Sequence, residues 1–194
     1  IQIWLTICWQ NFKLAAASHN QYFMEENQIQ FRQATTEDHA AIWEIIQQAI
    51  ERRRLEGSEQ WQSGYPNLTT ISDDIKNNYG FVLTVDNEIA AYTALILNDE
   101  PAYDDIKGKW LTDGDFYVIH RVAVSEKFAG KGLVKIFFDK IEDSVKSQNV
   151  PSIKVDTNFD NPAMINIFEK KGYQYCGEVM LVGGWRKAYE KVLK

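Results

Sequence analysis

The sequence predicts an α+β fold on a mixed, mostly antiparallel sheet, and three observations support this prediction. Two pairs of apolar runs are joined by the turn-forming dipeptides Asp86-Asn87 and Gly183-Gly184, which predicts two antiparallel hairpins. Elsewhere, strand-like runs alternate with segments whose apolar residues recur every three or four positions, as in helices that pack on a sheet. The 194 residues are 45% apolar and 13% aromatic, which suits one packed core.

The first half of the predicted fold contains a short strand, two helices and a hairpin. Thr35 and Asp38 have the spacing of a capping box, and the apolar residues after them keep helical spacing until Gly57. A loop then carries the aromatic residues Trp61 and Tyr65. The expected elements are a strand at 29–32, helices at 35–57 and 70–78, and hairpin strands at 81–85 and 88–97.

The second half begins with a polar connecting segment at 98–115 that contains Trp110. Pro162 lies at the first turn of the last expected helix, where proline is favoured. The expected elements are strands at 116–124 and 153–157, helices at 133–145 and 161–171, and a closing hairpin of 173–182 and 185–193.

A glycine loop, Gly130-Lys131-Gly132, lies between the strand at 116–124 and the helix that follows it. Glycines let several backbone N–H groups point at one spot, and a helix N-terminus adds its positive dipole end. This arrangement favours a phosphate-bearing ligand, although a simple tight turn would have the same pattern. The spacing does not fit a Walker loop, and Lys135 stands where a dinucleotide fingerprint needs its third glycine.

Two motifs give the chain a specific resemblance. The glycine loop Ala129–Val134 aligns with the family signature Arg/Gln-x-x-Gly-x-Gly/Ala, and Asn161 to Tyr173 aligns with an Asn followed by a helix that ends in Tyr-Glu-Lys-x-Gly-Phe. Together with the element order from residue 29 to 193, these motifs resemble the GNAT superfamily of acetyl-CoA-dependent N-acetyltransferases. The resemblance implies helices on both faces of the sheet and a splayed central pair of strands, 116–124 and 153–157.

The resemblance also implies a cosubstrate, acetyl-CoA, and no metal. The pantetheine arm would pair with the strand backbone at Val122 and Val124 like an added strand, and Asn161 would hold it from the other side or only cap the following helix. The implied cofactor-binding residues are Val122, Ala123, Val124, Ala129, Gly130, Lys131, Gly132, Leu133, Val134, Lys135, Asn161 and Phe168.

Three positions depart from the family pattern. Ala129 replaces the Arg or Gln that opens the loop, and Val134 replaces the small residue that closes it. Phe168 replaces the tyrosine that protonates the departing thiolate in many members. Tyr173 and Cys176 are alternative acids, but both residue types suit core packing in this segment.

His120 is the leading candidate for the general base. Strand alternation predicts that it shares a face with Val122, and some family members carry an active-site histidine at this position. A half-buried structural histidine is the competing interpretation. Asp156 is a second catalytic candidate, which could orient an ammonium or hold a water, or be a plain strand-end carboxylate. Arg121 is interpreted as a structural ion-pair partner.

Trp61, Tyr65 and Tyr117 are the candidate acceptor-binding residues, although loop aromatics such as the first two also serve as packing lids. The expected reaction moves an acetyl group from acetyl-CoA to a primary amine of a small molecule or peptide, by direct attack in a ternary complex. An acyl-CoA-binding module with little turnover is the alternative, and an unrelated structural domain is a third.

Charge and composition limit the classes of partner that the chain is expected to bind. The formal charge of −6 disfavours nucleic acid or an anionic membrane as the main partner. Cys8 and Cys176 lie far apart, and no metal spacing surrounds the three histidines, so neither a disulfide framework nor a zinc site is indicated and a reducing, cytoplasmic setting is expected. The expected oligomeric state is a monomer or homodimer. Residues 1–23 are interpreted as an N-terminal extension, possibly non-native, that precedes a single domain at 24–194.

Overall fold

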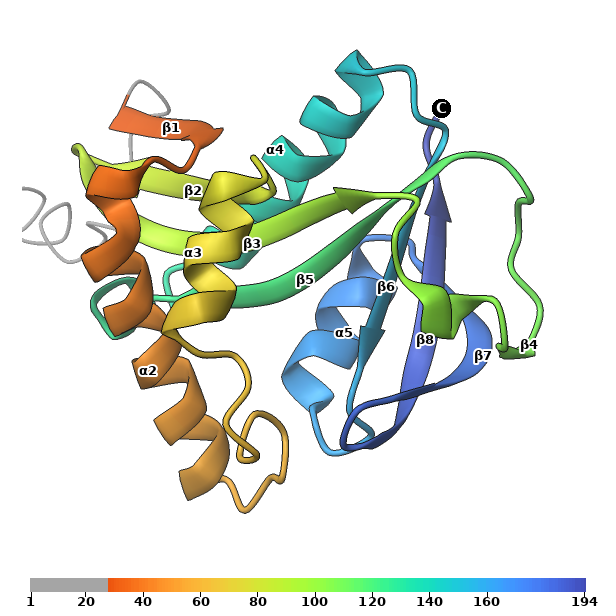
Figure 1. The fold of residues 1–194 in the computed structure, drawn as a ribbon. Coiled ribbons are helices and arrows are strands. Elements are labelled where there is room, and N and C mark those ends of the chain that lie inside the picture. Colours follow the sequence, from red (N-terminus) through yellow and green to blue (C-terminus); the bar gives the residue numbers. More distant parts are fainter. Residues whose placement is uncertain (1–27) are drawn as a thin grey trace, which may run out of the picture.

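The computed structural model describes residues 28–194, which form one eight-stranded sheet with helices on both faces (Figure 1). The strand order is β1-β2-β3-β5-β6-β8-β7-β4, and every neighbouring pair is antiparallel except β5 and β6. The predicted fold class is therefore confirmed. The proposed extension at 1–23 lies outside the described residues.

The strands are β1 (Ile29–Gln33), β2 (Gly80–Val85), β3 (Glu88–Leu97), β4 (Lys107–Gly108), β5 (Phe116–Val124), β6 (Ser152–Thr157), β7 (Gln174–Leu181) and β8 (Gly184–Val192). The helices are α2 (His39–Leu55), α3 (Leu68–Lys76), α4 (Leu133–Ser147) and α5 (Pro162–Lys170), with short 3-10 turns η2 (Thr36–Asp38), η3 (Pro101–Tyr103) and η4 (Glu126–Phe128).

Local chemistry explains most of these boundaries. Asp86 and Asn87 both have positive φ, 51° and 65°, which suits the tight β2–β3 hairpin expected from this dipeptide. The predicted helix at 70–78 begins two residues earlier, because the Asn67 side chain accepts a hydrogen bond from the Thr70 N–H at 3.0 Å. Strand β4 was not predicted, since its two residues are too short to show a pattern.

Different helices and loops pack on the two faces of the sheet. Helices α4 and α5 pack on one face over a large apolar cluster that includes Ile119, Phe137 and Phe168. On the other face, α2 and α3 cover the β1–β2–β3 half. The connection between β3 and β5 covers the rest of this second face, where Tyr103 and Val118 share a smaller cluster.

The parallel ladder between β5 and β6 is short. It runs from Phe116–Ser152 to Ile119–Val155 and ends there, whereas β5 continues to Val124. In residues 28–194, no strand lies along this edge of β5 beyond Ile119. The strands thus separate in the middle of the sheet, as the resemblance implied.

A bulge at Arg121 overturns one expectation about β5. Arg121 has φ 57°, and the β3–β5 register shifts opposite it, between Tyr92 and Ala94. Because a bulge adds one residue, alternation changes phase across it. Ile119 and Val122 therefore pack in the same α4-side cluster. The prediction that His120 and Val122 share a face is wrong, because His120 faces η3 on the opposite side.

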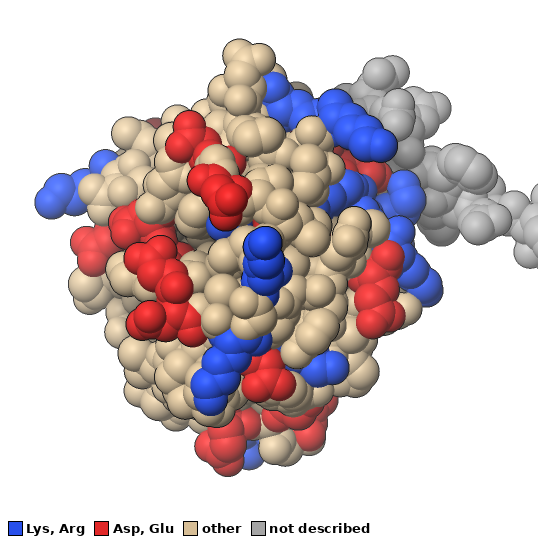
Figure 2. All heavy atoms as spheres, turned by 90° about the vertical axis from the view of Figure 1, so that its right-hand side faces the viewer, with Lys and Arg blue, Asp and Glu red and all other residues tan. Residues whose placement is uncertain are grey.

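The surface around β4 and β7 carries both signs of charge (Figure 2). Acidic and basic side chains are interspersed on this face, and neither sign covers it as one continuous field. No helix within residues 28–194 combines the length and apolarity that a membrane crossing requires.

Candidate functional site

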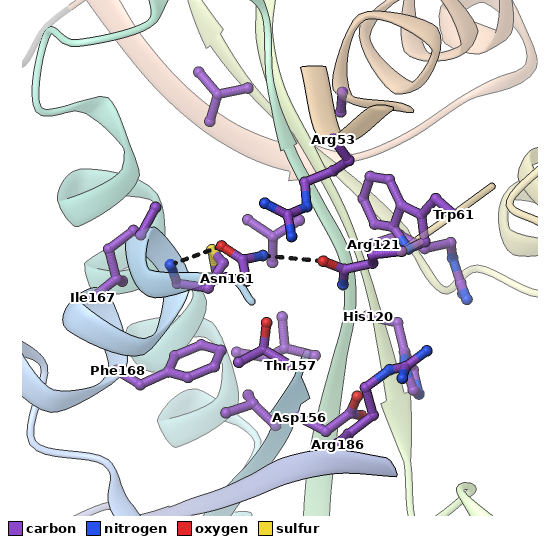
Figure 3. Close-up of a pocket in the computed structure, with 18 of the residues that line it drawn as sticks. Arg53, Trp61, His120, Arg121, Asp156, Thr157, Asn161, Ile167, Phe168 and Arg186 are labelled. Atoms are coloured by element: carbon purple, nitrogen blue, oxygen red, sulfur yellow. Dashed lines mark hydrogen bonds between the residues drawn. The ribbon is translucent and has the colours of Figure 1, made fainter. Parts of the chain in front are cut away.

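A cavity of about 950 Å³ opens where β5 and β6 separate. Its walls come from the β5 and β6 ends, the glycine loop, α5, the end of α2 with its following loop, and the β7–β8 hairpin. Figure 3 shows Ile167 and Phe168 on one side and Trp61 and Arg121 on the other. The cavity therefore connects the α4–α5 face with the face under η3.

The glycine loop forms one end of this cavity. Gly130 and Gly132 both have φ 73°, a left-handed conformation that glycine adopts without strain. A Cβ atom at either position would meet nothing within 4 Å, so the space in front of the backbone is open. Helix α4 starts directly after Gly132. An open glycine backbone before a helix N-terminus is an anion-binding arrangement.

Most of the predicted cofactor residues line this end, but three do not. Val122, Val124, Ala129, Gly130, Gly132, Leu133, Val134, Asn161 and Phe168 line the cavity. Ala123 is buried in the α2–α3 cluster instead. Neither Lys131 nor Lys135 lines the cavity: the Lys131 ammonium lies over the Phe128 ring, and Lys135 pairs with Asp139 at 3.0 Å. The backbone of Lys131 still belongs to the loop.

Helix α5 forms the adjoining wall. Asn161 caps it, since its Oδ1 accepts a hydrogen bond from the Met164 N–H at 3.2 Å. Its Nδ2 donates to Gln60 Oε1 at 3.1 Å, across the cavity (Figure 3). Phe168 is buried against the rings of Tyr173 and Tyr189. Tyr173 lies in the core behind it.

Three half-buried ionisable groups, Glu100, His120 and Asp156, line the other end, on the face under η3, and the buried Tyr103 lies beside them. The Tyr103 hydroxyl donates a hydrogen bond to Asp156 Oδ1 at 2.8 Å. His120 Nε2 lies 3.4 Å from Glu100 Oε2. Glu100 and Tyr103 come from the polar connecting segment at 98–115, in which the sequence showed no functional signal. We call Glu100, Tyr103, His120 and Asp156 the acidic chamber.

In the acidic chamber, burial raises the pKa values of the two carboxyl groups and lowers that of the histidine. Burial raises the pKa of Asp156 to about 6; the Tyr103 hydrogen bond opposes this rise and the nearby Glu100 charge adds to it. Burial also raises the pKa of Glu100. The same effect, with the Arg121 charge, lowers the pKa of His120 to about 3. Near pH 7, His120 is therefore neutral, and Asp156 is ionised but readily protonated.

Arg121 has the structural role expected of it. Its guanidinium makes two hydrogen bonds to Asp74, at 2.8 and 2.6 Å, and both side chains are less than a tenth exposed. It also donates to the Tyr65 hydroxyl. This ion pair joins β5 to α3 and positions Tyr65 at the cavity wall.

The predicted acceptor residues divide into two groups. Trp61 and Tyr65 line the cavity. Tyr117 does not, because it faces the α4-side cluster and donates a hydrogen bond to Gln148 at 2.6 Å. Tyr117 lies where β5 and β6 are still paired, away from their separation. Tyr117 is therefore not part of the cavity wall that Trp61 and Tyr65 form.

Three cavity arginines, Arg52, Arg53 and Arg186, were not singled out from the sequence. Arg53 at the end of α2 pairs with Asp160 at 2.8 Å, which connects α2 to the β6–α5 loop. Arg186 on β8 lines the cavity near Asp156. An arginine in a strand at an inward position is the one sequence signal that could have identified Arg186.

These features coincide with a known family. The sequence profile described as the acetyltransferase (GNAT) family matches residues 41–173, which is more than half of the chain. The protein belongs to the GNAT acetyltransferase family. Among residues 28–194, no group of three or more His, Cys, Asp or Glu side chains is arranged to hold a metal ion.

Individual relatives support the same assignment. The chain is 30% identical over 149 residues to the uncharacterized N-acetyltransferase YesJ of Bacillus subtilis, covering 74% of this chain and 81% of that protein. A GNAT-family acetyltransferase structure from Streptococcus agalactiae has a TM-score of 0.80 and 38% identity, covering 86% of this chain and 96% of that one. The structure of yncA from Salmonella typhimurium with its cofactor acetyl-CoA shares the fold at 15% identity, with a TM-score of 0.61 and coverage of 86% of this chain and 95% of that one.

Proposed function

We propose that the protein transfers the acetyl group of acetyl-CoA to a primary amine of a small molecule or peptide. The observation that carries the proposal is the shared cavity. It extends from the open glycine loop to the acidic chamber, through the gap where β5 and β6 separate. A phosphate-bearing donor at one end and a cationic amine at the other would then meet between the two strands.

The residues present fit acetyl-CoA. The Gly130–Gly132 backbone and the α4 N-terminus suit the pyrophosphate. The β5 edge beyond Ile119 has unpaired space for an extended pantetheine arm, which would bind like an added strand. The cosubstrate supplies an activated acetyl thioester, and the protein supplies the positions of both reactants.

Asp156, rather than His120, is the base in this proposal. A histidine whose pKa is about 3 is a weak base near neutral pH, whereas a carboxylate whose pKa is about 6 is well matched to the task. The acceptor ammonium enters the acidic chamber and loses a proton to Asp156, directly or through water. His120, in its neutral form, and Glu100 orient the amine.

The transfer then needs one bond to form and one to break. The amine nitrogen attacks the thioester carbonyl carbon, the carbon–sulfur bond breaks, and the electron pair leaves on sulfur. The nitrogen, positively charged after the attack, loses its second proton to water and becomes the neutral amide. Phe168 has no proton to give, and the hydroxyl of Tyr173 and the thiol of Cys176 lie outside the cavity lining. Solvent therefore protonates the thiolate, which is a stable enough leaving group to allow it.

The competing function is an acyl-CoA-binding module with little turnover, motivated by Ala129 and Phe168. Thiol release from acetyl-CoA, measured with a broad panel of amines, separates the two functions. Release that depends on one class of amine supports the enzyme. Saturable acetyl-CoA binding without release for any amine would favour the binding module.

The cofactor end has its own test, thermal stabilisation by acetyl-CoA. Gly130→Asp should abolish the stabilisation, because a carboxylate would repel the pyrophosphate. Gly130→Asn is the matched control, since Asn has the same size and also tolerates positive φ. Gly130→Asn should retain much of the stabilisation. Equal stabilisation of the Asp variant and the wild type would remove the loop from the site.

A further inference from the structure

Arg186 is a cation without a carboxylate partner in the cavity wall. Four arginines line the cavity, Arg52 and Arg53 at the end of α2, Arg121 on β5 and Arg186 on β8. Arg53 and Arg121 hold Asp160 and Asp74, and Arg186 lies on the strand whose register pairs with Asp156. Within residues 28–194, no carboxylate oxygen lies within 4.0 Å of the Arg186 guanidinium. Its hydrogen bonds go to two backbone carbonyls, those of Trp185 at 3.1 Å and Val182 at 3.5 Å.

Much of the hydrogen-bonding capacity of the Arg186 guanidinium is unused. Arginine has five N–H donors in a planar fork that matches a carboxylate. The side chain is half-buried, and burial lowers the Arg186 pKa, although the charges of Asp156 and Asp160 oppose this. A partly desolvated cation without an anionic partner is unfavourable, and an anionic ligand group would relieve that cost.

The register of β6 and β8 places Arg186 diagonally across from Asp156. Asp156 pairs with Ala188 across β6 and β8, and Arg186 is two residues along β8 from Ala188, on the same face. The Cα atoms of such diagonal neighbours are roughly 7–8 Å apart. Figure 3 shows Arg186 and Asp156 together at one side of the cavity. A negative and a positive group thus face the same small space.

We infer that the acceptor is a free amino acid, whose amine lies in the acidic chamber and whose carboxylate binds Arg186. This inference rests on the proposed function and narrows its substrate class. A diamine would bring a second cation to Arg186. Unless it begins with Asp or Glu, a peptide N-terminus has no carboxylate within a few bonds of its amine, unlike a free α-amino acid or a short ω-amino acid.

Matched acceptors test the inference. The twenty amino acids are compared with their carboxamides and with their decarboxylated amines in an acetyl-CoA thiol-release assay. The best amino acid should exceed its amide in kcat/KM by about 10- to 100-fold, as expected for a charge-assisted hydrogen bond. If amides or plain amines are acetylated as efficiently as the best amino acid, the inference is wrong.

Arg186 variants connect this preference to the proposed residue. Arg186→Gln should raise KM for the amino acid and leave that for its amide nearly unchanged, and Arg186→Lys should restore part of the preference. Lys187→Gln is the control, because Lys187 is the next residue of β8 and points to the opposite face. An equal loss for the acid and its amide would assign Arg186 a merely structural role.

A binding measurement separates failure of this inference from failure of the proposed function. Calorimetry with saturating CoA reports amino-acid binding without turnover. A preference for the acid over its amide that disappears in Arg186→Gln supports the inference even if no acetyl transfer occurs. Binding of neither compound, or equal binding of both, overturns the inference whether or not the protein is an acetyltransferase.

Discussion

Replacing Asp156 with Asn should make the protein less active and more stable. The carboxyl is buried beside Glu100, and its pKa is about 6 against an ordinary value of 3.8. The folded state therefore binds this proton more readily than the unfolded chain does. Stability from this group is greatest at low pH and is lost as the pH rises from about 4 through 6.

The structure gives the size of both effects. The pKa difference corresponds to about 3 kcal/mol of folding free energy lost near pH 7, where both states are ionised. Asn avoids this cost and still offers Oδ1 to the Tyr103 hydroxyl. For a domain of this size, the gain corresponds to a Tm increase of roughly 6–12 °C. Loss of the base should lower kcat/KM by roughly 10²–10⁴-fold.

Two assays measure these effects with the same pair of variants. Thermal unfolding is compared at pH 8 and pH 4, and the stability gain of Asp156→Asn should shrink at pH 4. The pH dependence of kcat/KM should show an apparent pKa of about 6 in the wild type and in His120→Gln, and lose it in Asp156→Asn. His120→Gln is the control because Gln can still donate a hydrogen bond to Glu100.

Two outcomes would refute this reasoning. If the pH dependence of kcat/KM with an apparent pKa of about 6 persists in Asp156→Asn and disappears in His120→Gln, then His120 is the base. If Asp156→Asn is no more stable at pH 8 than the wild type, the carboxylate is not held at an energetic cost, and its raised pKa loses its basis.

Three further predictions concern the cavity wall and its support. Ala129→Arg should tighten acetyl-CoA binding in calorimetry by about 10- to 100-fold, because a guanidinium can add a charge-assisted bond to phosphate; unchanged affinity would show that another group already does so. Phe168→Tyr should leave the transfer rate the same or raise it, whereas a large decrease would contradict solvent protonation of the thiolate. Asp74→Ala should destabilise the fold by roughly 3–5 kcal/mol in urea unfolding, because it leaves Arg121 buried and unpaired; a loss below about 1 kcal/mol would mean that solvent reaches the guanidinium.

Local patterns predicted the fold well because each depends on neighbouring residues. The Asp86-Asn87 turn, the glycine loop and the Asn161 cap are satisfied within a few residues, and the structure has each at the expected place. The helix at 70–78 was misplaced by two residues because the capping role of Asn67 was not recognised. The two residues of β4 form a strand only because β7 lies beside them.

The candidate site was predictable at its cofactor end and much less so at its acceptor end. Gly130 and Gly132 belong to one contiguous loop, so the sequence shows them together. Glu100, Asp156 and Arg186 come from three distant segments that the sheet order brings into one cavity. His120 was misjudged because alternation does not hold across the Arg121 bulge.

The sequence by itself determined the α+β class, the family and the position of the glycine loop, because periodicity, turn chemistry and contiguous motifs are properties of the chain. The tertiary structure alone decided which charges share the cavity and how strongly each is buried. Burial and neighbouring charges determine pKa values, and both depend on residues far apart in sequence. For this reason Asp156, with a pKa of about 6, replaced His120 as the proposed base only once the fold had placed both groups.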